Sequence, residues 1–126
     1  MSHIRSKDTK PEVMVRHFLF SRGFRYRLYR KDLPGKPDIV LTKYKTVIFI
    51  NGCFWHGHKD CKYATLPSEN HDFWLTKISD NIERDKLNYE KLNKLGWKVI
   101  EIWQCELKPK FRENTLNNLL LKLRNE

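Results

Sequence analysis

Asn51-Gly-Cys-Phe-Trp-His-Gly-His-Lys-Asp-Cys61 is the stretch around which the rest of this sequence is organised. Its two cysteines and two histidines offer thiolate and imidazole ligands at spacings that suit a tetrahedral zinc ion. Phe54 and Trp55 lie among these residues, where a core strand or an ordinary surface loop would seldom place two large aromatic side chains together. We therefore expect a loop that folds around a metal ion and carries aromatic residues at its tip.

A third cysteine, Cys105, follows a predicted strand and can complete a site of three sulfurs and one nitrogen with Cys53 and Cys61. The spacing allows either His56 or His58 as the nitrogen ligand and leaves the other histidine for acid–base chemistry. Four protein ligands leave no open position for a substrate, so such a zinc ion would be structural. The alternative is a set of buried, reduced cysteines with exposed histidines.

Length and composition favour one soluble domain, spanning residues 1–126, with an acidic partner. No apolar run approaches the roughly 20 residues of a membrane span, and the N-terminus lacks the apolar segment of a secretory signal. We therefore expect a cytoplasmic protein with no membrane partner. Its 25 Lys and Arg residues against 15 Asp and Glu residues give a formal net charge of +10, which favours nucleic acid as the partner. A ribosome-like or merely basic surface is the alternative.

The first predicted element is a helix that begins at Thr9. Thr9 and Glu12 have the spacing of a capping box, and Pro11 suits the first turn of a helix. We expect the helix to end at Arg22, because Gly23 is a favourable residue for the C-terminal stop.

Three strands are predicted next. Apolar and basic residues alternate over 24–29, which is typical of a half-buried strand. A loop with two prolines and a glycine follows over 30–37. The β-branched runs 38–41 and 46–50, joined by 43–45, then predict a hairpin that is buried on both faces.

The second half of the chain predicts helix, strand and helix. A long helix from about residue 71 to Gly96 is indicated by apolar residues at three- and four-residue steps, namely Trp74, Ile78, Ile82, Tyr89, Leu92 and Leu95. Charged residues fall on its other faces, namely Asp80, Glu83, Arg84, Asp85 and Lys86. Residues 97–103 predict a strand, and 114–124 a helix that buries Leu116, Leu119, Leu120 and Leu123. This order predicts an α/β sandwich around a mixed sheet, with the active site at strand ends.

Asp38 is the first candidate for a catalytic residue. It ends the segment Gly35-Lys-Pro-Asp38 at the start of a predicted strand, where a nuclease can present a carboxylate to a divalent cation such as Mg²⁺. A Pro-Asp pair before a strand is otherwise an ordinary turn. The neighbouring strand ends Phe49-Ile50-Asn51, without the second acid and the lysine that nuclease sites of this type commonly place there.

Phe54, Trp55 and Trp74 are candidates for contact with DNA bases. Nucleic-acid-binding proteins use such side chains as wedges that stack on or between bases. Trp74 has core packing as its alternative, because it falls on the apolar stripe of a helix.

Six blocks of the sequence, in order, resemble the very-short-patch-repair (Vsr) DNA mismatch endonucleases. They are Leu33-Pro-Gly-Lys-Pro-Asp38, Val47-Ile-Phe-Ile-Asn-Gly-Cys-Phe-Trp-His56, Phe73-Trp-Leu-Thr-Lys-Ile78, Asn81-Ile-Glu-Arg-Asp85, Leu95-Gly-Trp-Lys-Val99 and Trp103-Gln-Cys-Glu-Leu107. The resemblance implies a restriction-endonuclease-like α/β/α fold around a mixed central sheet. It also implies a structural zinc ion and Mg²⁺-dependent nicking 5′ of the thymine in a T:G mismatch that deamination of 5-methylcytosine has produced.

The resemblance also implies the cellular context and the partners. We expect a monomer that acts on duplex DNA with a T:G mismatch, is associated with the nucleoid when bound, and works with other repair proteins. A related nuclease with another target and a zinc-stabilised DNA-binding module without catalysis are the alternatives. A pure binding module would have no use for a carboxylate and a free histidine around one point.

Residue roles carry over to matching positions. Asp38 matches the metal-binding carboxylate, His56 the catalytic histidine and Glu12 an acidic residue of the active site. Ile50 would offer its backbone carbonyl to Mg²⁺. The zinc ligands would be Cys53, His58, Cys61 and Cys105, and the residues inserted into DNA Phe54, Trp55 and Trp74.

This sequence departs from a well-known member of the family at three places. Ile50 replaces a threonine, which is tolerable because a backbone carbonyl carries the role. Asn51 replaces a second active-site histidine, which leaves His56 as the one acid or base. The gap between His58 and Cys61 is one residue longer.

Overall fold

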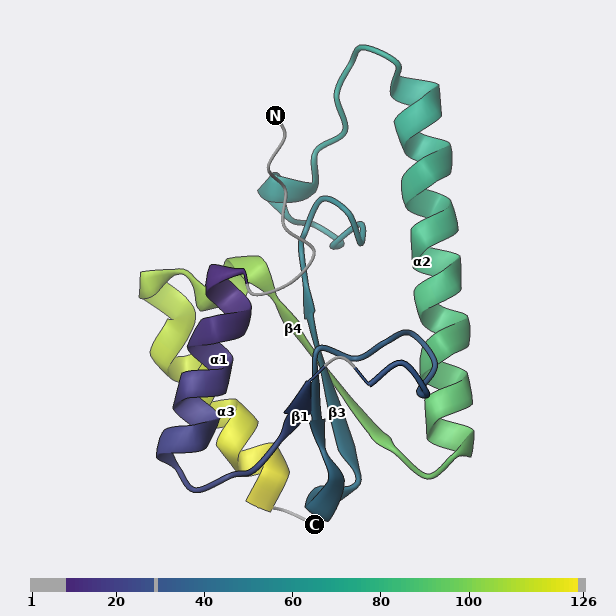
Figure 1. Ribbon diagram of the computed structural model, residues 1–126. Coiled ribbons are helices and arrows are strands. Elements are labelled where there is room, and N and C mark those ends of the chain that lie inside the picture. The colour runs from purple at the N-terminus through teal and green to yellow at the C-terminus, as the bar shows by residue number, and fades with distance from the viewer. Residues whose placement is uncertain (1–8, 29, 125–126) are drawn as a thin grey trace.

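The computed structural model describes residues 9–28 and 30–124. The helices are α1 (Lys10–Ser21), α2 (His71–Lys94) and α3 (Pro109–Arg124), and the strands are β1 (Arg27–Leu28), β2 (Ile39–Leu41), β3 (Thr46–Asn51) and β4 (Lys98–Trp103) (Figure 1). Short 3₁₀ helices cover Thr42–Tyr44, Lys62–Ala64 and Gln104–Leu107. No helix in these two ranges combines the length and the hydrophobicity that a bilayer crossing requires.

The four strands form one mixed sheet in the order β1-β2-β3-β4, which confirms the expected α/β class. β2 is antiparallel to both β1 and β3, whereas β3 and β4 are parallel and α2 connects them. In the β2–β3 pair, Ile39 lies opposite Ile48. The start of β2 therefore lies beside the end of β3, and this register brings Asp38 next to Ile50.

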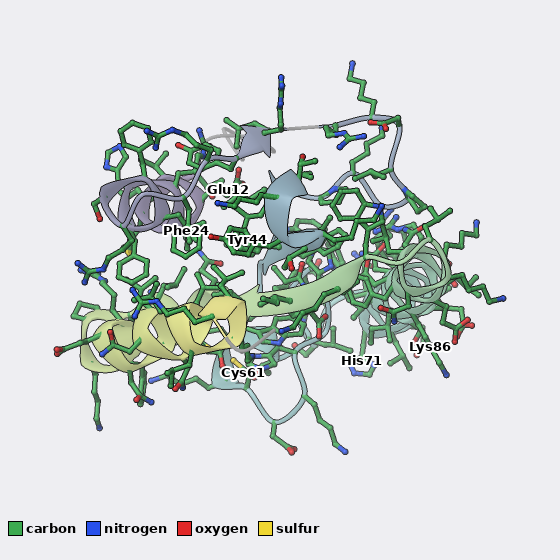
Figure 2. All side chains as sticks on the ribbon, turned by 90° about the horizontal axis from the view of Figure 1, so that it is seen from below. Glu12, Phe24, Tyr44, Cys61, His71 and Lys86 are labelled. Atoms are coloured by element: carbon green, nitrogen blue, oxygen red, sulfur yellow. The ribbon has the colours of Figure 1, made fainter. Side chains whose placement is uncertain are left out.

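Helices cover both faces of the sheet, because strand residues of β2 and β3 alternate between two hydrophobic cores. One core joins Ile39, Leu41 and Ile48 to the buried faces of α1 and α3. The other joins Val40, Val47 and Phe49 to Leu92 of α2 and to Trp97. Figure 1 shows α1 and α3 on one side of the strands and α2 on the other, and in Figure 2 Phe24 and Tyr44 lie on the side of α1 and α3. The predicted sandwich with a two-sided hairpin is thus present.

The start of α1 differs from the predicted capping box. Thr9 is the N-cap residue, but its side chain accepts no backbone hydrogen bond there. Its hydroxyl donates instead to Oε2 of Glu12 at 3.1 Å. Glu12 is only 4% exposed, and its other oxygen lies 3.6 Å from the guanidinium of Arg16. The Glu12 carboxylate therefore accepts from the Thr9 side chain, whereas in a capping box it would accept from the backbone N–H of the N-cap residue.

Two predicted boundaries were wrong. The strand expected over 24–29 is reduced to Arg27–Leu28, because Phe24 is drawn into the core beside Tyr44, with ring centroids 5.3 Å apart; Tyr29 lies outside the described residues. α3 begins at Pro109 instead of Asn114. Its first turn carries one large apolar residue, the exposed Phe111, so hydrophobic periodicity gave no signal there.

The apolar stripe predicted for α2 was partly wrong. Ile82 and Leu95 are 45% and 56% exposed, whereas the polar Asn81 is buried together with Ile78 and Leu92. Leu95 is the C-cap residue, beyond the last turn of the helix. Figure 1 explains the pattern at Asn81 and Ile82, because the N-terminal half of α2 extends beyond the sheet. That half packs against the loop after β3, where Asn81 donates a hydrogen bond to the backbone carbonyl of Trp55.

Candidate functional site at the ends of β2 and β3

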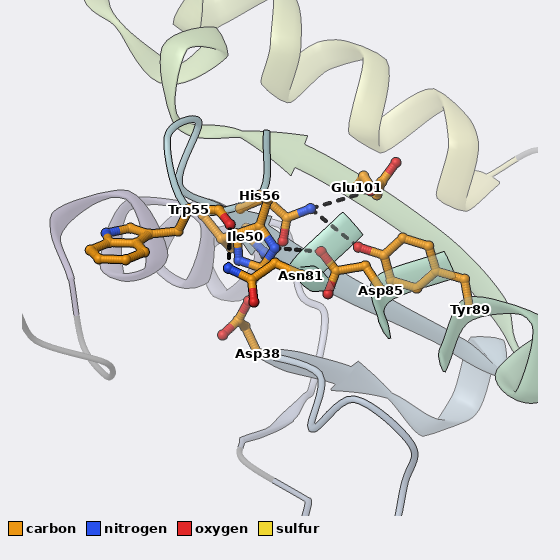
Figure 3. A network of polar contacts seen from close by, with 9 residues as sticks. Asp38, Ile50, Trp55, His56, Asn81, Asp85, Tyr89 and Glu101 are labelled. Atoms are coloured by element: carbon orange, nitrogen blue, oxygen red, sulfur yellow. Dashed lines mark hydrogen bonds and ion pairs between the residues drawn. The ribbon is translucent and has the colours of Figure 1, made fainter. Parts of the chain in front are cut away.

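A cavity of about 550 Å³ opens where β2 begins and β3 ends. Its lining includes Glu12 from α1, Asp38 before β2, Ile50 at the end of β3, and His56 from the loop that follows β3. These four residues, singled out in the sequence as the nuclease site, are therefore brought together. Figure 3 shows Asp38 and Ile50 in the same region as His56. The site lies at strand ends, as the order of elements predicts.

The Asp38 carboxylate is held at the sheet edge by a hydrogen bond. The backbone N–H of Ile50 donates to Oδ2 of Asp38 at 2.6 Å. Burial raises the pKa of Asp38 to about 6, the Ile50 hydrogen bond opposes this, and the nearby charge of Glu12 adds to it. An ionised Asp38 is thus poorly solvated and lies near a second carboxylate. A bound cation would relieve both conditions.

The donor atoms around Asp38 suit Mg²⁺. This ion prefers hard oxygen ligands and commonly takes one or two carboxylates together with waters and substrate phosphate. The N–H and C=O groups of one strand residue point toward the same neighbouring strand. Since the N–H of Ile50 points to Asp38, the Ile50 carbonyl is directed to that side as well. Asp38 and Ile50 therefore fit the predicted magnesium site.

His56 is oriented by a carboxylate that the sequence reasoning missed. Its Nδ1 atom lies 2.6 Å from Oδ2 of Asp85, and both side chains are largely buried (Figure 3). A carboxylate can only accept, so Nδ1 carries the proton and Nε2 is the nitrogen left for proton exchange. Asp85 was assigned to the charged faces of α2. Its spacing gave a usable signal, because Asp85 lies four residues before Tyr89 and seven before Leu92, on the inward face.

The loop after β3 is closed by its own backbone and rests closely on α2. The N–H of His56 donates to the carbonyl of Gly52 at 3.1 Å, and Nδ2 of Asn81 donates to the carbonyl of Trp55 at 2.9 Å. Gly57 has a φ of +60°, and a Cβ atom there would lie 2.6 Å from Cδ1 of Ile82. Glycine is thus required at Gly57 by both conformation and space.

The four predicted zinc ligands converge at the end of β4. Ligand atoms of Cys53, His58, Cys61 and Cys105 all lie within 4.8 Å of one another. Nδ1 of His58 is 3.4 Å from the sulfur of Cys105, and the His58 ring stacks on Trp103 with centroids 4.1 Å apart. Spacing alone left His56 and His58 open, and the geometry places His58 in this cluster and His56 in the cavity.

The chemistry of this cluster fits a zinc ion. Three sulfurs and one imidazole nitrogen form a common structural zinc set. Burial, followed by the neighbouring Cys53, raises the pKa of Cys105 to about 12. Several thiolates at this distance need a cation to coexist. The described residues thus offer a metal site that is separate from the cavity around Asp38.

Phe54, Trp55 and Trp74 contact one another at the rim of the cavity. Their ring centroids are 5.2 to 5.8 Å apart, and Trp55 is 37% exposed and lines the cavity. Trp74 belongs to neither hydrophobic core and is partly buried, and its ring packs on Phe54 and Trp55. The exposed Phe73, which the sequence reasoning did not single out, packs against Trp74 at 5.1 Å.

The cavity also contains a lysine, which comes from the loop before β2 and not from the end of β3. The end of β3 carries none, but Lys36, from the loop before Asp38, lines the cavity with a φ of +49°. Asn51 borders the cavity as well, and its side chain bonds away from Asp38, to Tyr89 and Glu101.

Known proteins resemble this chain over most of its length. A family model described as DNA mismatch endonuclease Vsr matches residues 1–63. Type II nicking enzyme V.NmeAIP from Neisseria meningitidis is 55% identical over 125 residues, which cover 98% of this chain and 89% of that protein. Type II nicking enzyme V.XorIIP from Xanthomonas oryzae is 50% identical, covering 85% and 78%. DNA mismatch endonuclease Vsr from Escherichia coli is 40% identical, covering 86% and 69%.

Proposed function

The chain belongs to the Vsr family of DNA mismatch endonucleases, and from this premise we propose that it nicks one strand of duplex DNA 5′ of the thymine in a T:G mismatch, with Mg²⁺ as the catalytic ion. One observation carries this proposal. The buried Asp38 carboxylate, bonded to the end of β3, shares a cavity with His56, whose Nδ1 is bonded to Asp85. A carboxylate for a cation and an oriented imidazole at one point are what phosphodiester hydrolysis needs.

Each residue has a defined part in this reaction. Asp38 and the Ile50 carbonyl would hold Mg²⁺, which when bound neutralises charge that develops on the scissile phosphate. His56 accepts the proton of the attacking water at Nε2, and Asp85 stabilises the imidazolium that results. Lys36 offers a cation to a phosphate at the cavity mouth. Glu12 lies within electrostatic range of Asp38 and adds negative charge that favours cation binding.

Recognition of the mismatch is assigned to the aromatic residues at the rim. A T:G wobble presents nearly normal groove edges, so hydrogen bonds to the bases discriminate only modestly. Opening the base stack costs a few kcal/mol, and costs least where pairing is already weak. Phe54, Trp55 and Trp74 lie together beside the cavity, where they could test the stack next to the scissile phosphate.

We also propose a fold family and a structural metal ion for this chain. A mixed sheet with helices on both faces and a carboxylate at the start of a strand supports a restriction-endonuclease-like fold. The site with Cys53, His58, Cys61 and Cys105 would hold a structural zinc ion. We also propose that the protein acts as a monomer, because the cavity around Asp38 and the cysteine cluster are both assembled without a residue from a second copy.

A nicking assay tests the proposed function. One duplex carries a central T:G mismatch and its matched control carries C:G in the same flanking sequence, each with and without Mg²⁺. We expect strand-specific nicking of the first duplex only, and only with Mg²⁺. Equal nicking of both duplexes would reject mismatch specificity, and nicking in a chelator would reject the catalytic role of Mg²⁺.

A panel of flanking sequences separates the main proposal from its runner-up. Two of the relatives described above are named type II nicking enzymes, so this chain could serve a different target sequence. Cleavage of fully paired DNA at one sequence, with no preference for T:G, would favour that second candidate.

A further inference from the structure

Asn51 joins three elements through its side-chain amide. It ends β3, is 2% exposed, and its Nδ2 atom donates to the hydroxyl oxygen of Tyr89 at 3.2 Å and to Oε2 of Glu101 at 3.2 Å. Figure 3 marks these bonds with the two dashed lines that end at Tyr89 and Glu101. Because Tyr89 belongs to α2 and Glu101 to β4, one amide group links β3 to a helix and to the adjacent strand.

These bonds lie between two cavities. Asn51 borders the cavity around Asp38, whereas Tyr89 and Glu101 line a second cavity of about 500 Å³. His56 borders both cavities. Tyr89 and Glu101 therefore lie in the second cavity, and Asn51 connects them to the cavity around Asp38.

The neighbours of Asn51 in the chain are all functional. The N–H of Ile50 holds Asp38, and the carbonyl of Gly52 accepts from the N–H of His56. Tyr89 lies four residues after Asp85 on α2, so the two side chains share one face of the helix. A displacement of the end of β3 would thus move the metal-binding backbone, and a displacement of α2 would move the partner of His56.

We propose that Asn51, Tyr89 and Glu101 form a positioning network that fixes the end of β3, with its metal-binding backbone, relative to Asp85 on α2. The network deepens the proposed function and rests on it. None of its members touches the reacting atoms. It holds Asp38 and Ile50 at the distance from His56 and Asp85 that a single phosphate can bridge.

The contacts of Tyr89 suit this role. Its ring packs on Phe49 of β3 with centroids 4.9 Å apart, so only the hydroxyl is left to be oriented by Asn51. Burial raises the pKa of Tyr89, and the nearby Glu101 carboxylate raises it further, so the group remains a neutral hydroxyl. Misplacement of catalytic groups by about 1 Å can lower a rate by about 100-fold. Removal of an outer partner of this kind typically lowers activity by about 10–100-fold.

Tyr89→Phe tests the network by removing one oxygen atom. We expect single-turnover nicking of the T:G duplex to slow by about 10–100-fold at saturating enzyme, with unchanged Kd for the duplex. Tyr44→Phe is the matched control, because it removes the same hydroxyl from a half-buried tyrosine on the opposite face of the sheet. That variant should nick at the wild-type rate.

A double mutant separates positioning from general stability. Asn51→Ala and Tyr89→Phe break the same hydrogen bond, so the double variant should be no slower than the slower single variant. A second pair changes charge: Glu101→Gln should slow nicking, whereas Glu90→Gln, in the same cavity, should not. Circular dichroism and the zinc content of each variant confirm that the folded fraction is unchanged.

The outcomes distinguish failure of the network from failure of the proposed function. Wild-type nicking with equally fast Tyr89→Phe and Glu101→Gln variants would overturn the network and leave the endonuclease assignment intact. A loss that the Tyr44→Phe control shares, or additive losses in the double variant, would also overturn it. Absence of wild-type nicking would overturn both.

Discussion

His56 and Asp85 form a hydrogen-bonded pair, with 2.6 Å between Nδ1 and Oδ2, although 29 positions separate them in the chain. His56 belongs to a loop closed by backbone hydrogen bonds, and Asp85 to the middle of α2. The loop and α2 must therefore dock on each other for His56 and Asp85 to form this bond. The reactive tautomer of His56 therefore depends on how the loop docks on the helix.

Asp85→Asn is expected to lower the nicking rate by about 10²–10⁴-fold, because the amide cannot stabilise an imidazolium and can favour the wrong tautomer of His56. Single-turnover cleavage of a T:G duplex measures this. Asp80→Asn, on an exposed position of the same helix, is the control and should retain wild-type activity. Comparable activity of the two variants would show that Asp85 has no part in proton transfer.

Asp38→Asn is expected to abolish Mg²⁺-dependent nicking and to stabilise the Mg²⁺-free protein. The pKa of Asp38 is raised to about 6, so between about pH 4 and 6 the folded chain binds more protons than the unfolded chain, and stability falls as pH rises. The neutral amide avoids that loss. The difference between this pKa and that of an ordinary aspartate corresponds to about 3 kcal/mol in the free energy of unfolding above pH 7, and to less below pH 5.

Urea denaturation of both proteins at several pH values measures this difference. Asp32→Asn is the control, because Asp32 is exposed and pairs with Arg30, which lowers its pKa instead. It should give no stabilisation. An Asp38→Asn protein that still nicks with Mg²⁺ would rule out Asp38 as the metal-binding carboxylate.

The two histidines of the loop are expected to fail in different ways. His58→Ala and Cys105→Ser should release zinc and lower the Tm, because each removes one of four ligands. His56→Ala should keep its zinc but lower the nicking rate by about 10²–10⁴-fold. Elemental analysis should find one zinc per wild-type chain. Zinc lost from His56→Ala and retained in His58→Ala would reverse the two roles.

Trp55→Ala is expected to weaken binding to a T:G duplex by about 1–3 kcal/mol, the scale of one lost base–aromatic stack. Binding to fully paired DNA should change far less. Phe111→Ala is the control, since Phe111 is an exposed aromatic residue on α3. Fluorescence anisotropy with both duplexes measures the difference, and an equal loss on both would mean that Trp55 does not sense the mismatch.

Gly57→Ala is expected to be more damaging than Gly23→Ala. Both positions have positive φ, which costs an alanine about 1–2 kcal/mol. A Cβ at Gly57 would also collide with Ile82 and Ile78, which adds about 1–3 kcal/mol, whereas a Cβ at Gly23 meets nothing within 4 Å. Thermal unfolding compares the two, and equal losses would show that the loop does not rest tightly on α2. Nicking should fall in Gly57→Ala alone.

Residues whose chemistry is rare could be placed from the sequence. Cys53, Cys61 and Cys105 with a nearby histidine have few uses other than metal binding, and the β-branched runs of β2 and β3 could only form buried strands. Family resemblance then distinguished His56 from His58, which spacing could not do. The geometry agrees with that assignment, because only His58 lies in the cysteine cluster.

Residues whose chemistry is common could not be placed from the sequence. Asp85 has the spacing of an inward-facing residue, but that spacing does not reveal its partner, which lies in a loop 29 positions away. Asn81 was missed for a similar reason, since its partner is a backbone carbonyl that leaves no mark in the sequence. The short β1 depends on the packing of Phe24 in the core, and the early start of α3 on Pro109. Hydrophobic periodicity predicts neither.

The inward face of α2 fixes the relative positions of four residues of the site. Trp74, Asn81, Asp85 and Tyr89 follow one another along a single uninterrupted helix of 24 residues. Eleven positions from Trp74 to Asp85 amount to about 16 Å at 1.5 Å per residue, so the helix sets the distance along its axis between the aromatic cluster around Trp74 and the partner of His56. One residue inserted between Asn81 and Asp85 would rotate the carboxylate by about 100° away from His56. The packing of Trp74 and the pairing of His56 with Asp85 therefore depend on one uninterrupted helical register.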